Sequence, residues 1–316
     1  MTDLRLPAGA QNPSVPPDAS RQHFQELVGA DQGWIRRCRS AWRQGPDAVA
    51  QLIRADSPPW RALLEHGRPA PAADPLAEED EDADSLASIA ARAVAAVAGA
   101  LADPPRTEAA VAEARGCWAG LHVPLPGPDL VALPESLVTG APAEAQSVLR
   151  RLQDLRGGTG AAYAALQVLN LAAARPPGRG RTRVQVRVLF DQGPVGSAAT
   201  LHLALLPNGP AGLYPDPATM AFLTTDLGFR DSLTVAWETS HLAGHGLCVL
   251  WSVLEDRTPC HDMVHDSLGV AFGVGLSELD RCRRRLGSVR QPRRLDPRCA
   301  VTGALDHEHR VVRVGG

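Results

Sequence analysis

The stretch MVHDSLGVAFGVGL, residues 263–276, combines residue types that could carry out nucleophilic chemistry. Asp266 and Ser267 stand directly before an apolar run rich in small residues, a pattern that predicts a helix beginning close to Ser267. The first N–H groups of a helix have no partner within it and can hold an oxyanion, so Ser267 is a candidate nucleophile for acyl transfer. The alternative is that Asp266 or Ser267 only caps the helix, which is the commoner role of these residue types.

Histidines near this stretch raise a metal site as a second hypothesis. HLAGH, residues 241–245, spaces two histidines as a zinc-peptidase helix does, but Leu242 stands where that pattern has its catalytic glutamate. Cys260, His261 and His265 could add ligands, yet candidates on a predicted loop do not define a tetrahedral site, so we predict no metal and no cofactor. Three histidines remain candidates for a general base, because imidazole titrates near neutral pH: His241, His261 and His265.

Two other segments carry weaker signals. RCRRRLGSVRQPRRLDPR, residues 281–298, holds eight arginines and could contact phosphates or an acidic partner. It lacks interleaved aromatic residues, so a solvated surface insertion is favoured. LRGGTG, residues 155–160, has neither the lysine nor the spacing of a phosphate-binding loop and predicts a turn between two helices. We therefore expect no nucleic-acid partner.

The last segment, AVTGALDHEHRVVRVGG at residues 300–316, predicts a strand, a turn and a second strand followed by two glycines. Together with the segment around Ser267, this tail resembles the proteolytic domain of Lon-type serine peptidases. In that family a serine segment opens a helix, a Thr-Gly strand follows, and a valine-rich segment ends in Gly-Gly. The matching residues are Asp266, Ser267 and Gly269 in the first motif, Thr302 and Gly303 in the second, and Val311, Val314, Gly315 and Gly316 in the third.

The resemblance implies a site made of both segments. Ser267 would be the nucleophile, and Thr302 would orient the base. The residues assigned to the catalytic centre are Ser267, Asp266, His265 and Thr302. Those assigned to substrate binding are Leu268, Gly269, Gly315 and Gly316.

One departure from the family concerns the general base. Lon-type peptidases use a lysine of lowered pKa that comes just after the Gly-Gly, whereas all 32 basic residues of this sequence are arginines. His265-Asp266 also replaces the Gly-Pro that precedes the family's serine. Since a serine hydroxyl without a base is a weak nucleophile, three explanations stay open. The chain stops before a lysine of a longer protein, the domain is a pseudoenzyme, or a histidine acts as the base.

Composition indicates a globular bacterial protein. The chain has 316 residues, 44% of them apolar, a net charge of −3 and six scattered cysteines without a CxxC pair, which suits reduced thiols in the cytoplasm. The Pro-rich start lacks the apolar core of a signal peptide, and the longest apolar stretch is broken by Arg92, so we expect no membrane span. The abundance of arginine, alanine, proline and glycine is typical of a high-GC genome.

The spacing of apolar and β-branched residues along the sequence predicts an α+β fold with a mostly helical N-terminal domain. We expect a disordered segment at 1–19, a helical domain at 20–135 with an acidic linker near 69–85, and a Lon-like α+β domain at 136–316 that is incomplete at its C-terminus. Two helices broken at glycines are predicted within 141–177. Strands are predicted within 181–190, 199–207, 233–239 and 246–254, with Trp237 and Trp251 in the core.

These observations favour a Lon-like serine peptidase domain, part of a larger bacterial protein and inactive or incomplete as it stands. The alternative is a non-catalytic Lon-like pseudoenzyme or interaction module in a signalling or defence protein. The expected partners are a protein or peptide substrate and a protein bound through the helical domain, and assembly into an oligomer stays open. The sequence contains no Gly-x-x-x-x-Gly-Lys-Ser/Thr motif for ATP.

Overall fold

The computed structural model describes most of the chain from residue 89 onward. The described residues are 89–172, 182–191, 196–264, 266–284, 299–305 and 310–312, except 91–92, 95, 98, 102–103, 156, 222, 257 and 261. The predictions of a disordered segment at 1–19 and an acidic linker near 69–85 lie outside these residues.

Helices form the first layer of the described fold. After the short 3-10 helix η1 (Pro104–Arg106) come α5 (Thr107–Gly120), α6 (Glu135–Thr139), α7 (Ala143–Asp154) and α8 (Thr159–Ala172). The break between α7 and α8 falls at the predicted glycines. Alanine and leucine occur around most of α8, so nearly the whole helix is buried. It packs against α5 and α7.

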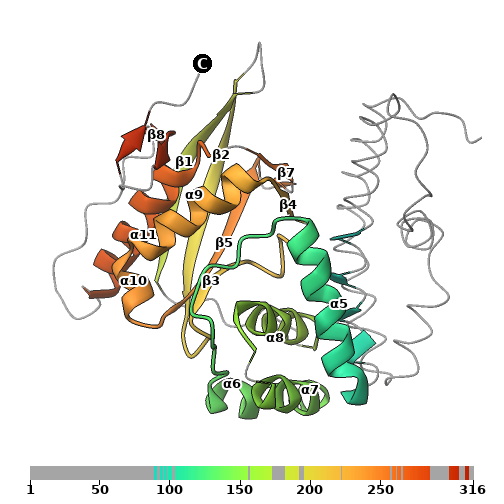
Figure 1. The fold of residues 1–316 in the computed structure, drawn as a ribbon. Coiled ribbons are helices and arrows are strands. Elements are labelled where there is room, and N and C mark those ends of the chain that lie inside the picture. The colour runs from blue at the N-terminus through green and yellow to red at the C-terminus, as the bar shows by residue number, and fades with distance from the viewer. Residues whose placement is uncertain are drawn as a thin grey trace, which may run out of the picture.

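A six-stranded mixed sheet forms the second layer (Figure 1). Its strands are β1 (Arg183–Asp191), β2 (Gly196–Leu206), β3 (Gly212–Pro215), β5 (Cys248–Glu255), β6 (Thr258–Pro259) and β8 (Ala300–Val301). The order is β3-β5-β2-β1-β8, with β6 on β5. β1, β2 and β5 pair antiparallel, whereas β3 and β8 join them in parallel. The strands predicted within 181–190, 199–207 and 246–254 are confirmed.

Three helices of the C-terminal half alternate with these strands along the chain: α9 (Leu227–Glu238) and α10 (His241–Gly244) come between β3 and β5, and α11 (Gly269–Arg284) comes between β6 and β8. α9 and α11 lie side by side across one face of the sheet (Figure 1). Gly275 lets α11 come close to the strands, because a Cβ there would lie 2.5 Å from Leu203 Cδ1 and 3.2 Å from Val186 Cγ2. The sheet therefore positions the helix that follows Ser267.

The strand predicted at 233–239 is wrong, because these residues belong to α9 and the turn after it. The Asp226 side chain caps this helix by accepting the Phe229 N–H at 2.7 Å. The buried apolar positions then follow a helical spacing: Phe229, Leu233, Ala236 and Trp237. Burial of this face outweighs the strand preference of the Thr-Val pair. Trp237 and Trp251 are both buried, as predicted.

Two small sheets border the start of α11. β4 (Thr224–Thr225) pairs in parallel with β7 (Asp262–Met263). β9 (Ala304–Leu305) pairs antiparallel with β10 (Val311–Val312), so the predicted two-stranded tail is confirmed within residues 304–312.

The helical layer and the sheet share one hydrophobic core. Tyr163 of α8 stacks on Tyr214 of β3, with ring centroids 6.3 Å apart. Packing of α5 against α7 and α8 crosses the predicted boundary at residue 135, which stays a prediction. The mixed helix and strand content agrees with the predicted α+β class. None of the helices in the described part combines the length and apolar character needed to cross a bilayer.

Candidate functional site

Ser267 lies in the turn directly before α11, as its sequence context predicts. The residue is partly buried, and Asp266 beside it is exposed. The Gly269 N–H donates to the carbonyl oxygen of Asp266 at 3.0 Å, which closes the turn with Ser267 and Leu268 inside it. The turn is thus held by backbone groups, and the 16-residue helix directs the positive end of its dipole towards it.

The Thr-Gly segment of the tail binds directly to this turn. The Gly303 N–H donates to the carbonyl oxygen of Ser267 at 2.8 Å, and the carbonyl oxygen of Gly303 accepts the Val270 N–H at 3.0 Å. Thr302 precedes Gly303 and is exposed. The structure therefore brings Ser267, Asp266 and the Thr302 segment together.

Close packing explains the two glycines of the matched motifs. Gly303 has φ +143°, which disfavours any other residue, and a Cβ there would lie 3.0 Å from Val270 Cγ2. A Cβ on Gly269 would lie 2.2 Å from Ser232 Oγ. Both glycines are thus required by geometry, whatever chemistry the turn supports.

Ser232 is a residue of this site that the sequence did not indicate. It lies on α9 with a side chain only 5% exposed, and its hydroxyl donates to the carbonyl oxygen of Asp266 at 3.0 Å. The strand predicted at 233–239 begins one residue later and left Ser232 outside any predicted helix. A helical interpretation starting from the Asp226 cap would have placed Ser232 on the same face as Phe229 and Trp237.

Backbone geometry narrows the choice of oxyanion donors. The amides of Gly269 and Val270 already donate to the carbonyls of Asp266 and Gly303. Within the described part of the chain, the amides of Ser267 and Leu268 have no such backbone acceptor. These two N–H groups are therefore the candidates for holding an oxyanion beside the Ser267 hydroxyl.

Leu268 and Gly269, predicted to bind substrate, are both buried. The Leu268 side chain contributes to the hydrophobic core, so either residue would meet a substrate through its backbone. Two other predicted substrate residues, Gly315 and Gly316, lie outside the described residues, as does His265.

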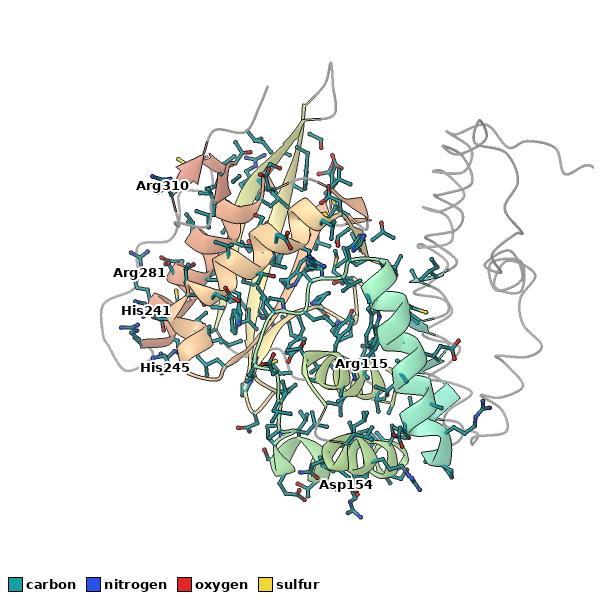
Figure 2. The ribbon with its side chains drawn as sticks, in the orientation of Figure 1. Arg115, Asp154, His241, His245, Arg281 and Arg310 are labelled. Carbon is teal, nitrogen blue, oxygen red and sulfur yellow. The ribbon has the colours of Figure 1, made fainter. Side chains whose placement is uncertain are left out.

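The candidate base His241 is not near Ser267, which corrects that prediction. It is exposed on α10, and Figure 2 shows it beside Arg281, near the C-terminal end of α11. Arg281 comes twelve positions after Gly269 on α11, a distance of about 18 Å along the axis. Imidazole at that end cannot take a proton from the Ser267 hydroxyl. His261 is outside the described residues.

The arginines at the end of α11 are engaged in ion pairs. Arg281 pairs with Glu278, and Arg283 and Arg284 pair with Asp280, whose side chain is buried. Burial raises the pKa of Asp280, but hydrogen bonds from Arg284 and Arg283 outweigh it and hold the pKa below its usual range. This part of the Arg-rich stretch is thus bound to its own helix, and residues 285–298 lie outside the described ones.

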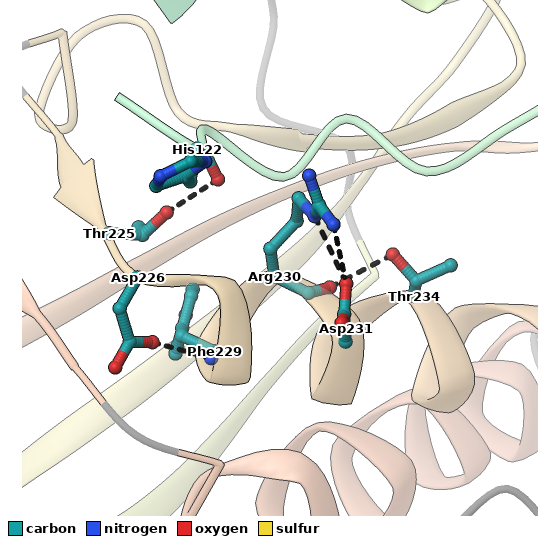
Figure 3. A network of polar contacts seen from close by, with 7 residues as sticks. All are labelled: His122, Thr225, Asp226, Phe229, Arg230, Asp231 and Thr234. Atoms are coloured by element: carbon teal, nitrogen blue, oxygen red, sulfur yellow. Dashed lines mark hydrogen bonds and ion pairs between the residues drawn. The ribbon is translucent and has the colours of Figure 1, made fainter. Parts of the chain in front are cut away.

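Polar contacts lie around the start of α9, and Figure 3 shows the one that joins it to the helical layer, between Thr225 and His122. The Thr225 hydroxyl donates to the carbonyl oxygen of His122 at 2.5 Å, just after α5. The Asp226 N–H donates to the carbonyl oxygen of Met263 at 3.3 Å, three residues before Asp266. Contacts thus run from α5 through β4 and β7 to the segment that contains Ser267.

Comparisons with protein-family models, curated proteins and solved structures find no match for this chain. Among the described residues, no group of three or more His, Cys, Asp or Glu is placed to hold a metal ion.

Proposed function

We propose that the sheet and helices from Arg183 onward form a Lon-like serine peptidase domain with Ser267 as its nucleophile. The observation that carries this proposal is the hydrogen bond from the Gly303 N–H to the carbonyl oxygen of Ser267, 2.8 Å long. The serine segment and the Thr-Gly segment of the resemblance lie far apart in the sequence, and this bond joins them at the start of α11.

In this proposal the Ser267 hydroxyl attacks a peptide carbonyl, and a general base takes the hydroxyl proton. The amides of Ser267 and Leu268 would stabilise the oxyanion, helped by the positive end of α11. The tetrahedral intermediate collapses to an acyl-enzyme as the protonated base gives its proton to the leaving amine. The same base then takes a proton from water, which hydrolyses the acyl-enzyme and restores the Ser267 hydroxyl. Thr302 would orient the base.

The base is the incomplete part of this proposal. The 316 residues contain no lysine, and among the described residues the Ser267 hydroxyl has no hydrogen-bonded partner. The second candidate function is a non-catalytic Lon-like module whose helical layer binds a protein partner, which needs no base at Ser267. In that role the Ser267 turn would be retained for its packing alone.

A fluorophosphonate probe separates the two functions. The probe is incubated with the 316-residue chain, with its Ser267→Ala variant, and with any longer natural chain that carries a lysine soon after Gly316. Labelling that the variant loses supports a peptidase site. Labelling of the longer chain alone assigns the base to that lysine, and no labelling of either leaves the non-catalytic module.

A further inference from the structure

Ser232 ties α9 to the turn that contains Ser267. Its hydroxyl donates to the carbonyl oxygen of Asp266 at 3.0 Å, and the same oxygen accepts the Gly269 N–H at 3.0 Å. The contact is partly buried, and Ser232 itself is only 5% exposed. The peptide group directly before Ser267 is therefore fixed by a side chain from another helix.

Gly269 and Ser232 lie so close together that position 269 has no room for a side chain. A Cβ on Gly269 would lie 2.2 Å from Ser232 Oγ but 3.5 Å from Ser232 Cβ. The hydroxyl itself thus occupies the space that a side chain at position 269 would need. This places the Ser232 oxygen between the Asp266 carbonyl and the first residue of α11.

The peptide group that follows Ser267 is held by a residue of the C-terminal tail. Its carbonyl oxygen accepts the Gly303 N–H at 2.8 Å. Both peptide planes beside Ser267 are therefore held by residues distant in sequence. Because these planes set the direction of the Cα–Cβ bond, they also set where the Ser267 hydroxyl can lie.

We propose that Ser232 is a positioning residue that fixes the turn around Ser267 and thereby sets the reactivity of its hydroxyl. The reactivity part of this inference rests on the proposed function. The fixing of the turn does not, because it follows from the hydrogen bond alone.

The test replaces Ser232 by alanine, which removes only the hydroxyl. Thr234→Val is the matched control, since the Thr234 hydroxyl donates to the Arg230 carbonyl within the same helix and does not reach the turn. Two quantities are measured: amide hydrogen exchange across residues 264–272, and fluorophosphonate inactivation separated into probe affinity and maximal rate.

We expect Ser232→Ala to speed exchange in the turn about tenfold, because the hydrogen bond from this buried serine is lost. The maximal labelling rate should fall about tenfold or more with probe affinity unchanged, because a mispositioned nucleophile slows the chemical step. Thr234→Val should change neither quantity. A purely structural role would leave the maximal rate at the wild-type value.

Unchanged exchange in Ser232→Ala would overturn the inference, and so would faster exchange with an unchanged labelling rate. Faster exchange that extends to residues 201–205 of β2 would indicate global destabilisation and would also count against a local tether. If Ser232→Ala does not fold, the same measurements are made on Gly269→Ala, whose added Cβ would displace the Ser232 hydroxyl. Absence of labelling in both the 316-residue chain and any longer natural chain would refute the proposed function, and the exchange data alone would then decide whether Ser232 holds the turn.

Discussion

The amide nitrogen of Gly303 lies 2.8 Å from the carbonyl oxygen of Ser267, so a residue near the end of the sequence is bonded to the turn that opens α11. The carbonyl oxygen of Gly303 in turn accepts the Val270 N–H at 3.0 Å. This reciprocal pair makes the tail part of the same small structure as the candidate nucleophile. A substitution in either segment should therefore alter the stability of the other.

Gly303→Ala should destabilise the junction between the tail and α11. A side chain at φ +143° is strained, which costs about 1–3 kcal/mol, and its Cβ would lie 3.0 Å from Val270 Cγ2. Urea unfolding should give a lower free energy of unfolding. Gly273→Ala is the control. Gly273 lies within α11, and a Cβ there would meet only Leu305 Cδ1, at 3.4 Å. This change should be neutral or should stabilise the protein by about 0.5–1 kcal/mol. Equal effects of the two changes would contradict the geometry at Gly303.

The contact between Ser232 and Gly269 should appear as non-additivity in a double-mutant cycle. Gly269→Ala places a Cβ 2.2 Å from Ser232 Oγ and should cost about 1–3 kcal/mol by overpacking. In the Ser232→Ala background the oxygen is absent, so the same change should cost about 1 kcal/mol less. Thermal and urea unfolding of the four proteins give the coupling free energy. Additive effects would mean that the two residues do not meet.

Thr225→Val should weaken the attachment of the helical layer. The change keeps the side-chain shape but removes the hydroxyl that donates to the His122 carbonyl at 2.5 Å, and we expect a loss of about 1 kcal/mol in the free energy of unfolding. Thr239→Val is a suitable comparison, because the Thr239 hydroxyl donates within an exposed helix end and its loss should cost less than about 0.5 kcal/mol. A loss no larger than that of Thr239→Val would rule out a structural role for this bond.

Cys260 should react slowly with iodoacetamide at neutral pH. Burial, with a further contribution from the negative charge of Glu255, raises the pKa of its thiol to about 11, whereas an unhindered cysteine has a pKa of about 8.5. Thiolate is the reactive form, so alkylation at pH 8 should be about a hundredfold slower than at the exposed Cys299 and should rise with pH towards 11. Peptide mass spectrometry follows each site separately. Equal rates at pH 8 would show that Cys260 is not protected in this way.

Local patterns were sufficient for much of the fold. Alternation and β-branched content predict β1, β2 and β5, and the paired glycines predict the break between α7 and α8. The strand prediction failed for α9, where the Asp226 cap and burial of Phe229 and Trp237 outweigh local preference. Strand order could not be predicted, because the parallel pairing of β8 with β1 depends on contacts between residues more than a hundred positions apart.

The site was predictable only in part for a related reason. Ser267 and Thr302 stand out because their motifs are local, and the structure brings their segments together. Ser232 has no motif of its own, and its role follows from the packing of α9 on α11. His241 was a candidate base by residue type alone, which carries no information on its distance from Ser267.

The most direct measurement is to locate a fluorophosphonate adduct by mass spectrometry after tryptic digestion. Cleavage at arginine releases residues 258–281 as one peptide that contains both Ser267 and Ser277. The proposed peptidase domain predicts an adduct on Ser267, formed in the natural protein with its base in place and lost in Ser267→Ala. An adduct on Ser277 or elsewhere, or none in any chain that contains this domain, would contradict Ser267 as the nucleophile.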